Sequence, residues 1–191
     1  MSCRAGFVWA TPQHFNRFIE ECGIGCELVT PHMLAAPFYR PTLNCLIIPT
    51  GFANPAYSNL LPALRASSPR INRFVENGGS LLVFGAAAER PDAYDWLPFK
   101  IVYRHDCHPR SIAFATVSDT RSIIDDYNPD AIECDGIFPE HEADGVGTCE
   151  SVAVIIEKHI GKGKIVVTSV HEYPSRRFLK DFCTKGLPTP F

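Results

Sequence analysis

A run of apolar residues between glycines, Gly78–Gly85, constrains the possible fold more than any other feature of this chain. Four consecutive residues within it, Leu81–Phe84, are large and apolar, which is typical of a strand covered on both faces of a sheet. Leu43–Pro49 is a second run of this kind. Segments with the helical spacing of apolar residues lie between such strands. This alternation predicts an α/β chain with a parallel sheet and helices on both faces.

The spacing of apolar residues and turn residues predicts one domain over residues 1–191. The first half predicts strands at 6–10, 26–29, 43–49 and 81–84, helices at 12–22 and 57–76, and either a helical turn or an ordered loop at 31–38. We expect Thr11 to cap the first helix and Pro69 to divide the helix at 57–76 into two pieces. The second half predicts strands at 100–104, 112–117, 136–138, 151–159 and 165–170, and a closing helix at 174–184. The predicted architecture is a three-layer sandwich whose mostly parallel sheet ends in an antiparallel hairpin turning at Gly161–Lys164.

Composition and charge argue against two classes of partner. Charged residues make up 20% of the 191 residues and the net charge is −3, so nothing favours binding to nucleic acid or to an anionic membrane. No apolar run approaches the roughly 18 residues that a membrane-spanning helix needs. The segment Met1–Ala10 is too short for a secretory signal, and we expect a cytoplasmic location. The eight cysteines form no C-x-x-C pair, and we expect reduced thiols that mostly pack as small apolar side chains.

Three segments resemble the class I glutamine amidotransferase-like superfamily, which has a flavodoxin-like fold. Leu46–Gly51 resembles the strand and glycine turn that provide an oxyanion amide in that family. Phe74–Gly85 resembles the helix, glycine pair and strand that lead to the nucleophile elbow, and is closest to the branch related to the amino-terminal region of biotin–protein ligases. Gly161–His171 resembles the late hairpin that delivers the catalytic histidine. The resemblance implies a flavodoxin-like α/β sandwich.

The departures from the family pattern bear on activity. The family has a cysteine nucleophile at the elbow, whereas this chain has Gly85 followed by the alanines Ala86–Ala88. His171 matches the family histidine, but Tyr173 stands where the family has a glutamate. Because glutamine hydrolysis needs a thiolate at the elbow, we expect no glutaminase activity. The resemblance then implies a non-catalytic domain that binds a small ligand or a protein partner in the cleft left by the active site, lined by Thr50, Gly51, Gly85–Ala88, His171 and Glu172.

The polar residues that follow the last predicted strand suggest an alternative function, that of a hydrolase-type enzyme. In it His171 is a general base oriented by Glu172, acting on water or substrate in the same cleft. Arg176, with Arg177 beside it, could bind a carboxylate or phosphate group of a ligand. The plain interpretation of the same residues is the start of a helix, with solvated arginines. Neither interpretation calls for a cofactor.

A second alternative is a metal-binding protein that uses the region between His105 and Cys149. His105, Cys107 and His108 offer imidazole and thiolate ligands. The residues that could complete such a site are Cys134, His141, Glu142 and Cys149. The spacing matches no standard zinc pattern, and in an extended segment His105 and Cys107 would face away from His108. The acidic residues between Asp125 and Asp144, Asp135 among them, are expected to form a solvated surface. Exposed phenylalanine or leucine on surface helices would allow a homodimer.

Overall fold

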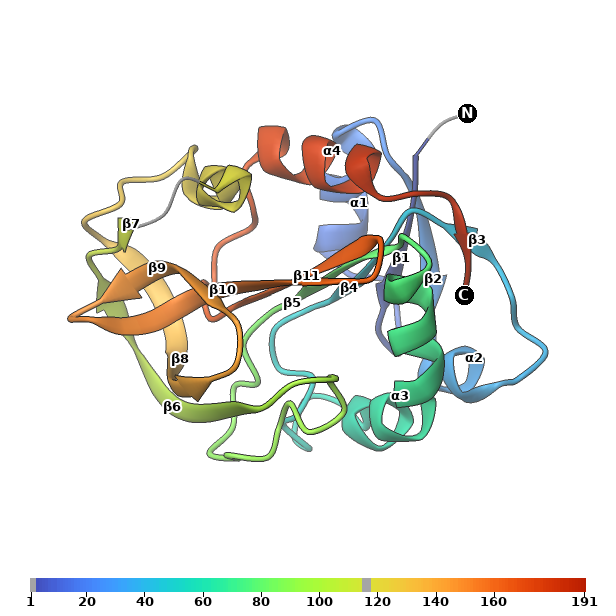
Figure 1. Cartoon of the computed structure of the whole chain (residues 1–191), viewed down its shortest axis with the longest axis horizontal. Coiled ribbons are helices and arrows are strands. Elements are labelled where there is room, and N and C mark those ends of the chain that lie inside the picture. The colour runs from blue at the N-terminus through green and yellow to red at the C-terminus, as the bar shows by residue number, and fades with distance from the viewer. Residues whose placement is uncertain (1–2, 115–117) are drawn as a thin grey trace.

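A large twisted sheet with helices on both of its faces forms the centre of the molecule (Figure 1). The computed structural model describes residues 3–114 and 118–191. In these residues ten strands make one sheet, whose main path runs β2-β1-β4-β5-β11-β10-β8-β6, with β7 and β9 beside it. The arrangement is the expected three-layer α/β architecture of the flavodoxin-like class.

One half of the sheet is parallel. Its strands are β1 (Arg4–Val8), β2 (Gly25–Val29), β4 (Cys45–Ile48), β5 (Ser80–Val83) and β11 (Gly163–Thr168). Every residue of the adjacent strands β4 and β5 is buried, as their unbroken apolar sequences predict. Because these five strands pair in parallel, their carboxyl ends lie at the same edge of the sheet.

Helices cover the two faces of the parallel half (Figure 1). On one face lie α1 (His14–Glu21) and α4 (Arg176–Lys185), and the short 3-10 helix η1 (Asp119–Ile124) lies on the same face beside α4, next to β9 of the antiparallel half. On the other lie α2 (Pro31–Ala35) and α3 (Leu60–Glu76). A small two-stranded sheet joins β3 (Thr42–Leu43) to β12 (Thr189–Pro190). Each face has its own buried apolar cluster, with the sheet between them.

The other half of the sheet is antiparallel. It contains β6 (Ile101–Arg110), β7 (Ala113–Phe114), β8 (Ile132–His141), β9 (Asp144–Cys149) and β10 (Val152–Ile160). The expected hairpin is confirmed, because β10 pairs antiparallel with β11. The sequence predicted only the apolar parts of β6 and β8 and missed β9, since their exposed faces carry polar residues. The expected strand at 112–117 falls partly on residues 115–117, which lie outside the described residues; its described part is β7.

Two predictions about helices were wrong. Helix α1 begins at His14 rather than near Thr11. The backbone N–H of Gln13 donates to Asn16 Oδ1 at 2.7 Å, and this hydrogen bond caps the helix at Gln13. Helix α3 continues through Pro69 as one helix of 17 residues. Hydrogen bonds on either side of the proline fix it in place. Ser67 Oγ donates to Leu34 O at 2.9 Å, and the Arg70 guanidinium donates to several carbonyls of the segment after α2.

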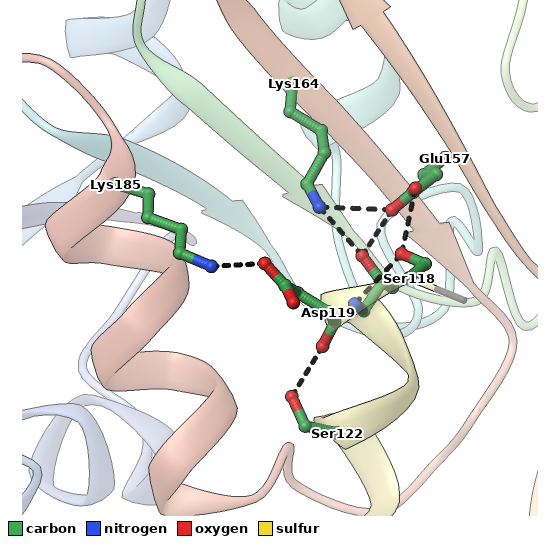
Figure 2. A network of polar contacts seen from close by, with 7 residues as sticks. Ser118, Asp119, Ser122, Glu157, Lys164 and Lys185 are labelled. Atoms are coloured by element: carbon green, nitrogen blue, oxygen red, sulfur yellow. Dashed lines mark hydrogen bonds and ion pairs between the residues drawn. The ribbon is translucent and has the colours of Figure 1, made fainter.

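A network of polar side chains ties η1 to the β10–β11 hairpin and to α4 (Figure 2). Lys164 Nζ lies 3.1 Å from Glu157 Oε2, and this carboxylate also accepts hydrogen bonds from the Ser118 and Thr120 hydroxyls. Lys185 pairs with Asp119 at the rim. Burial raises the pKa of Glu157, but the Thr120 and Lys164 contacts outweigh it and leave the pKa below its ordinary value. Glu157 and Lys164 each find partners within the network, so we interpret it as structural.

Candidate functional site

A cleft of about 590 Å³ opens at the edge of the sheet where the parallel strands end. In α/β sheets this is the edge at which ligands bind. The lining residues come from the segments that follow β1, β4, β5 and β11, and from β6 and β8 of the antiparallel half. Those used below are Thr50, Gly51, Tyr57, Ala87, His105, Cys107, Asp135, His171 and Tyr173.

The turn after β5 forms the floor of this cleft. Ala87 has a φ of +50°, a left-handed conformation that residues other than glycine seldom adopt. Strained turns of this kind hold the nucleophile in several enzyme folds. Asn54 Nδ2 fixes the turn by donating to Ala87 O at 2.7 Å. The strained elbow residue is thus Ala87 rather than Gly85, and it presents a methyl group to the cleft.

Gly85 is a glycine because another side chain occupies the space beside it. A Cβ atom at this position would lie 2.0 Å from Oδ2 of Asp135. The Asp135 carboxylate therefore packs directly against the backbone of the elbow. Because Gly85 has no side chain, the carboxylate of Asp135 on β8 can occupy the space beside it.

Asp135 holds His171 in the cleft. Oδ1 of Asp135 lies 3.0 Å from Nδ1 of His171, and backbone pairing fixes both residues. The Asp135 N–H donates to Ser169 O at 2.7 Å, and the His171 N–H donates to Glu133 O at 2.8 Å. The Tyr103 hydroxyl donates to the Asp135 carbonyl at 3.0 Å. Strand β8 and the segment that follows β11 thus place an acid–imidazole pair at the elbow.

The environments of the two side chains differ. The Asp135 side chain is 4% exposed, and its Oδ2 makes no hydrogen bond to any described residue. The His171 side chain is 59% exposed and faces the cleft. The hydrogen bond to Asp135 raises the pKa of His171 above its ordinary value, and partial burial opposes this rise only in part. A carboxylate that orients and charges an imidazole in this way is a common element of acid–base and binding sites.

The remaining residues predicted for the cleft fall into two groups. Thr50 and Gly51 line the cleft, while Ala86 is fully buried behind it. Glu172 does not contact the His171 ring. Its Oε1 accepts a hydrogen bond from the Glu133 N–H at 2.8 Å, so Asp135 takes the orienting place expected for Glu172.

Arg176 points away from the cleft. Its guanidinium pairs with Glu21 at 2.9 Å and lies over the ring of Phe18, with 4.8 Å between the guanidinium carbon and the ring centroid. The hydrogen bond to Glu21 raises the pKa of Arg176. Arg176 is thus engaged at the start of α4, where the plain interpretation of the sequence put it.

The residues proposed as metal ligands are divided between two faces of β6. His105 and Cys107 line the cleft, and burial raises the pKa of the Cys107 thiol. His108 lies on the other face, where its Nδ1 is 3.0 Å from Asp106 Oδ1. Cys134 and Cys149 are buried thiols. Among the residues 3–114 and 118–191, no three His, Cys, Asp or Glu side chains come together as metal ligands would.

Asp135 is the site residue that sequence analysis missed. It was assigned to a solvated acidic surface because it follows a series of acidic residues. A usable signal was present in Cys134–Phe138, where Asp135 precedes an apolar run and so stands within a strand rather than on a loop. A carboxylate within such a strand is buried only where it has a partner, which the sequence alone could not identify.

Three solved structures illustrate the similarity of this fold to those of known proteins. A protein described as part of a GMP synthase, from Thermoplasma acidophilum, matches with a TM-score of 0.61 and 12% identity, over 96% of this chain and 95% of that one. The cytoplasmic protein STM1381 from Salmonella typhimurium LT2 gives 0.58 and 13%, over 95% and 96%. A β-galactosidase from Bacillus circulans sp. alkalophilus gives 0.58 and 11%, over 96% of this chain but 30% of the enzyme.

At these identities the likeness shows the fold alone. The fold is a flavodoxin-like α/β sandwich, as the resemblance implied. No protein-family model matches the chain, and no curated protein matches its sequence. Among the described helices, none is long and apolar enough to cross a lipid bilayer.

Proposed function

We propose that this chain is a small-molecule-binding domain with an amidotransferase-like fold and a degenerate catalytic site, without glutaminase activity. The observation that carries the proposal is Ala87, which occupies the strained elbow and offers only a methyl group. Acyl transfer from glutamine needs a thiolate or an equivalent nucleophile at that point. Three segments resemble the amidotransferase-like superfamily, and one of them, Phe74–Gly85, resembles the branch related to biotin–protein ligases. This agrees with a shared ancestry of the cleft rather than of the reaction.

Two further features of the elbow argue against an oxyanion site. The Gly51 N–H, which the resemblance assigns to oxyanion binding, donates instead to Gly85 O at 2.9 Å. No α-helix follows the elbow over residues 88–99, so no helix N-terminus points at the cleft from this segment. An oxyanion needs free donors that are already in place before the reaction.

The cleft is nevertheless suited to hold a ligand. Its volume of about 590 Å³ lies within the range usual for small-molecule sites, roughly 300 to 1,000 Å³. Its walls are aromatic, and a few polar groups lie among them. The aromatic residues are Phe7, Trp9, Phe15, Tyr57, Phe84 and Tyr173. The polar residues include Gln13, Thr50, Asn54, His105 and His171. One structural neighbour is known as a cytoplasmic protein, and we extend that location to this chain as part of the proposal.

A fragment screen followed by NMR tests the proposal. We expect fragments that shift the signals of cleft residues in the wild type, and loss of those shifts in H171A. In parallel we expect no ammonia release from glutamine. Glutaminase activity above background would overturn the proposal, as would a screen in which no fragment perturbs a cleft residue.

A second candidate function is an enzyme that uses acid–base chemistry without a covalent intermediate. The observation that favours it is the 3.0 Å contact between Asp135 and His171, with an exposed imidazole at the cleft surface. In this mechanism Asp135 has the role that sequence analysis gave to Glu172, and His171 removes a proton from water or substrate. Ligands found in the screen would then be converted by the wild type and left intact by D135N.

A further inference from the structure

The hydrogen-bonding atom that the cleft leaves open is Nε2 of His171. Nδ1 of this ring contacts Asp135 Oδ1, and an ionised carboxylate can only accept hydrogen bonds. Nδ1 therefore carries the proton, and at a pH above the pKa of His171, where the imidazole is neutral, Nε2 is an acceptor. In the described part of the chain, Nε2 makes no hydrogen bond. A ligand in the cleft would satisfy it with a donor group.

The charges around the cleft disfavour anionic ligands. Among its described lining residues there is one carboxylate, Asp135, and no lysine or arginine. Glu133 and Glu172 add negative charge near His171. Carboxylates and phosphates are bound in proteins by cationic side chains or by free backbone amides. An anion here would meet the negative charge of these carboxylates, and no lysine or arginine among the described lining residues would offset it.

Two exposed tyrosines, Tyr57 and Tyr173, line the cleft. Tyr57 is 66% exposed and lies over Gly51. A Cβ atom added to Gly51 would be 3.1 Å from the ring of Tyr57. Tyr173 is 38% exposed and stacks on Phe15 with 4.6 Å between ring centroids. They follow β4 and β11, the strands on either side of β5. Rings placed in this way favour a flat ligand that can stack on them.

We propose that the cleft binds a flat, uncharged or cationic ring compound whose N–H group donates a hydrogen bond to Nε2 of His171. This inference rests on the proposed ligand-binding function and names the chemistry of the ligand. The tautomer that Asp135 imposes selects a donor group, and the tyrosines select a ring. The carboxylates near His171, with no lysine or arginine among the described lining residues, select against a negative charge.

Three probes of nearly equal shape test the inference: benzamide, the benzamidinium cation and benzoate. Each has one aromatic ring and one planar substituent, and only the first two have N–H donors. At a pH above the pKa of His171, where the imidazole is neutral, we expect benzamide and benzamidinium to shift the His171 ring signals and to bind at least tenfold more tightly than benzoate. Tenfold corresponds to about 1.4 kcal/mol, the scale of one hydrogen bond.

The D135N variant tests the role of the tautomer. Its amide can donate to Nδ1, so that Nε2 keeps the proton and becomes a donor. We expect the preference for benzamide over benzoate to fall about tenfold in D135N, which removing a distant carboxylate would not cause. D95N is the matched control, because Asp95 pairs with Arg65 on the surface and does not line the cleft.

The outcomes separate this inference from the function on which it rests. Benzoate binding as tightly as benzamide would overturn the inference, as would an unchanged preference in D135N. If none of the three probes binds while other fragments occupy the cleft, the inference fails and the proposed function stands. A cleft that binds neither these probes nor any fragment would overturn both.

Discussion

At the scale of single residues, the elbow of the cleft depends on a glycine without a side chain, Gly85, and on an alanine without a reactive group, Ala87. Gly85 has no side chain, and the Asp135 carboxylate fills the space beside it. Ala87 holds the strained turn and offers no reactive atom. The acid–imidazole pair that remains is built from β8 and the end of β11.

The first residue-scale prediction concerns Gly85. In G85A the added methyl group would meet Asp135 Oδ2 and Cβ at 2.0 and 2.7 Å, so that Asp135 must move. We expect a loss of about 2 kcal/mol in the free energy of unfolding, as overpacked cores usually show. Chemical denaturation measures it. In the control G25A the nearest atom to the new Cβ is 3.5 Å away, and we expect a change within about 0.5 kcal/mol. Equal stability of G85A and wild type would refute this account of position 85.

The second residue-scale prediction concerns the pKa of His171. Because the hydrogen bond to Asp135 raises that pKa in the folded state, the pair stabilises the fold fully below the unfolded value of 6.5. The contribution is lost as the pH rises through the folded pKa. In D135N we expect the His171 pKa to fall, which an NMR titration of its ring protons measures. A pKa that stays the same in D135N would show that Asp135 does not charge the imidazole.

At the scale of secondary-structure elements, α3 shows tertiary contacts overriding a local signal. A proline within a helix removes one backbone hydrogen bond and crowds the preceding turn. Pro69 is exposed, whereas Leu64, Ile71 and Phe74 of the same helix are buried against the sheet. Burial of these side chains on both sides of Pro69 outweighs the local cost of the proline and keeps the helix in one piece.

This balance predicts the effect of replacing Pro69. P69A restores an N–H group that can donate to the Arg65 carbonyl, and it removes the ring from an exposed position. We expect the free energy of unfolding to rise by about 1 to 2 kcal/mol, since a proline costs about 3 kcal/mol in a helix interior and also stiffens the unfolded chain. Thermal or chemical denaturation measures the change. A destabilised P69A would mean that the helix needs the geometry that proline imposes.

At the scale of the whole molecule, the cleft exists because two sheet halves of different kinds meet. The parallel half provides the elbow and the strand ends, and the antiparallel half provides Asp135, His105 and Cys107. The network around Glu157 secures this junction, because it joins η1 to the hairpin of β10 and β11. Its electrostatics make part of the stability of the fold dependent on pH.

The pH dependence follows from the lowered pKa of Glu157. A carboxyl group whose folded pKa is depressed stabilises the fold above its unfolded value, here 4.5, and this contribution is lost as the pH falls through the folded pKa. The Glu157 and Lys164 side chains are 13% and 20% exposed, so E157Q leaves Lys164 largely buried without its partner. We expect E157Q to lose about 2 kcal/mol near pH 7, and the difference from wild type to shrink below about pH 4.

Denaturation at several pH values measures this difference. E140Q is the matched control, since Glu140 pairs with Lys100 on the surface, and we expect it to unfold at the same denaturant concentration as wild type. A deficit of E157Q that is constant between pH 7 and about pH 3 would contradict the electrostatic explanation.

The sequence by itself determined the strand and helix alternation, the α/β class and the late hairpin. These follow from local patterns, because unbroken apolar runs such as Leu81–Phe84 must be buried on both faces. Only the tertiary structure decided that Ala87 is the elbow residue and that Asp135 rather than Glu172 orients His171. Those facts depend on contacts between β8, β5 and β11, which are distant in the chain, and no local spacing records which carboxylate reaches which imidazole.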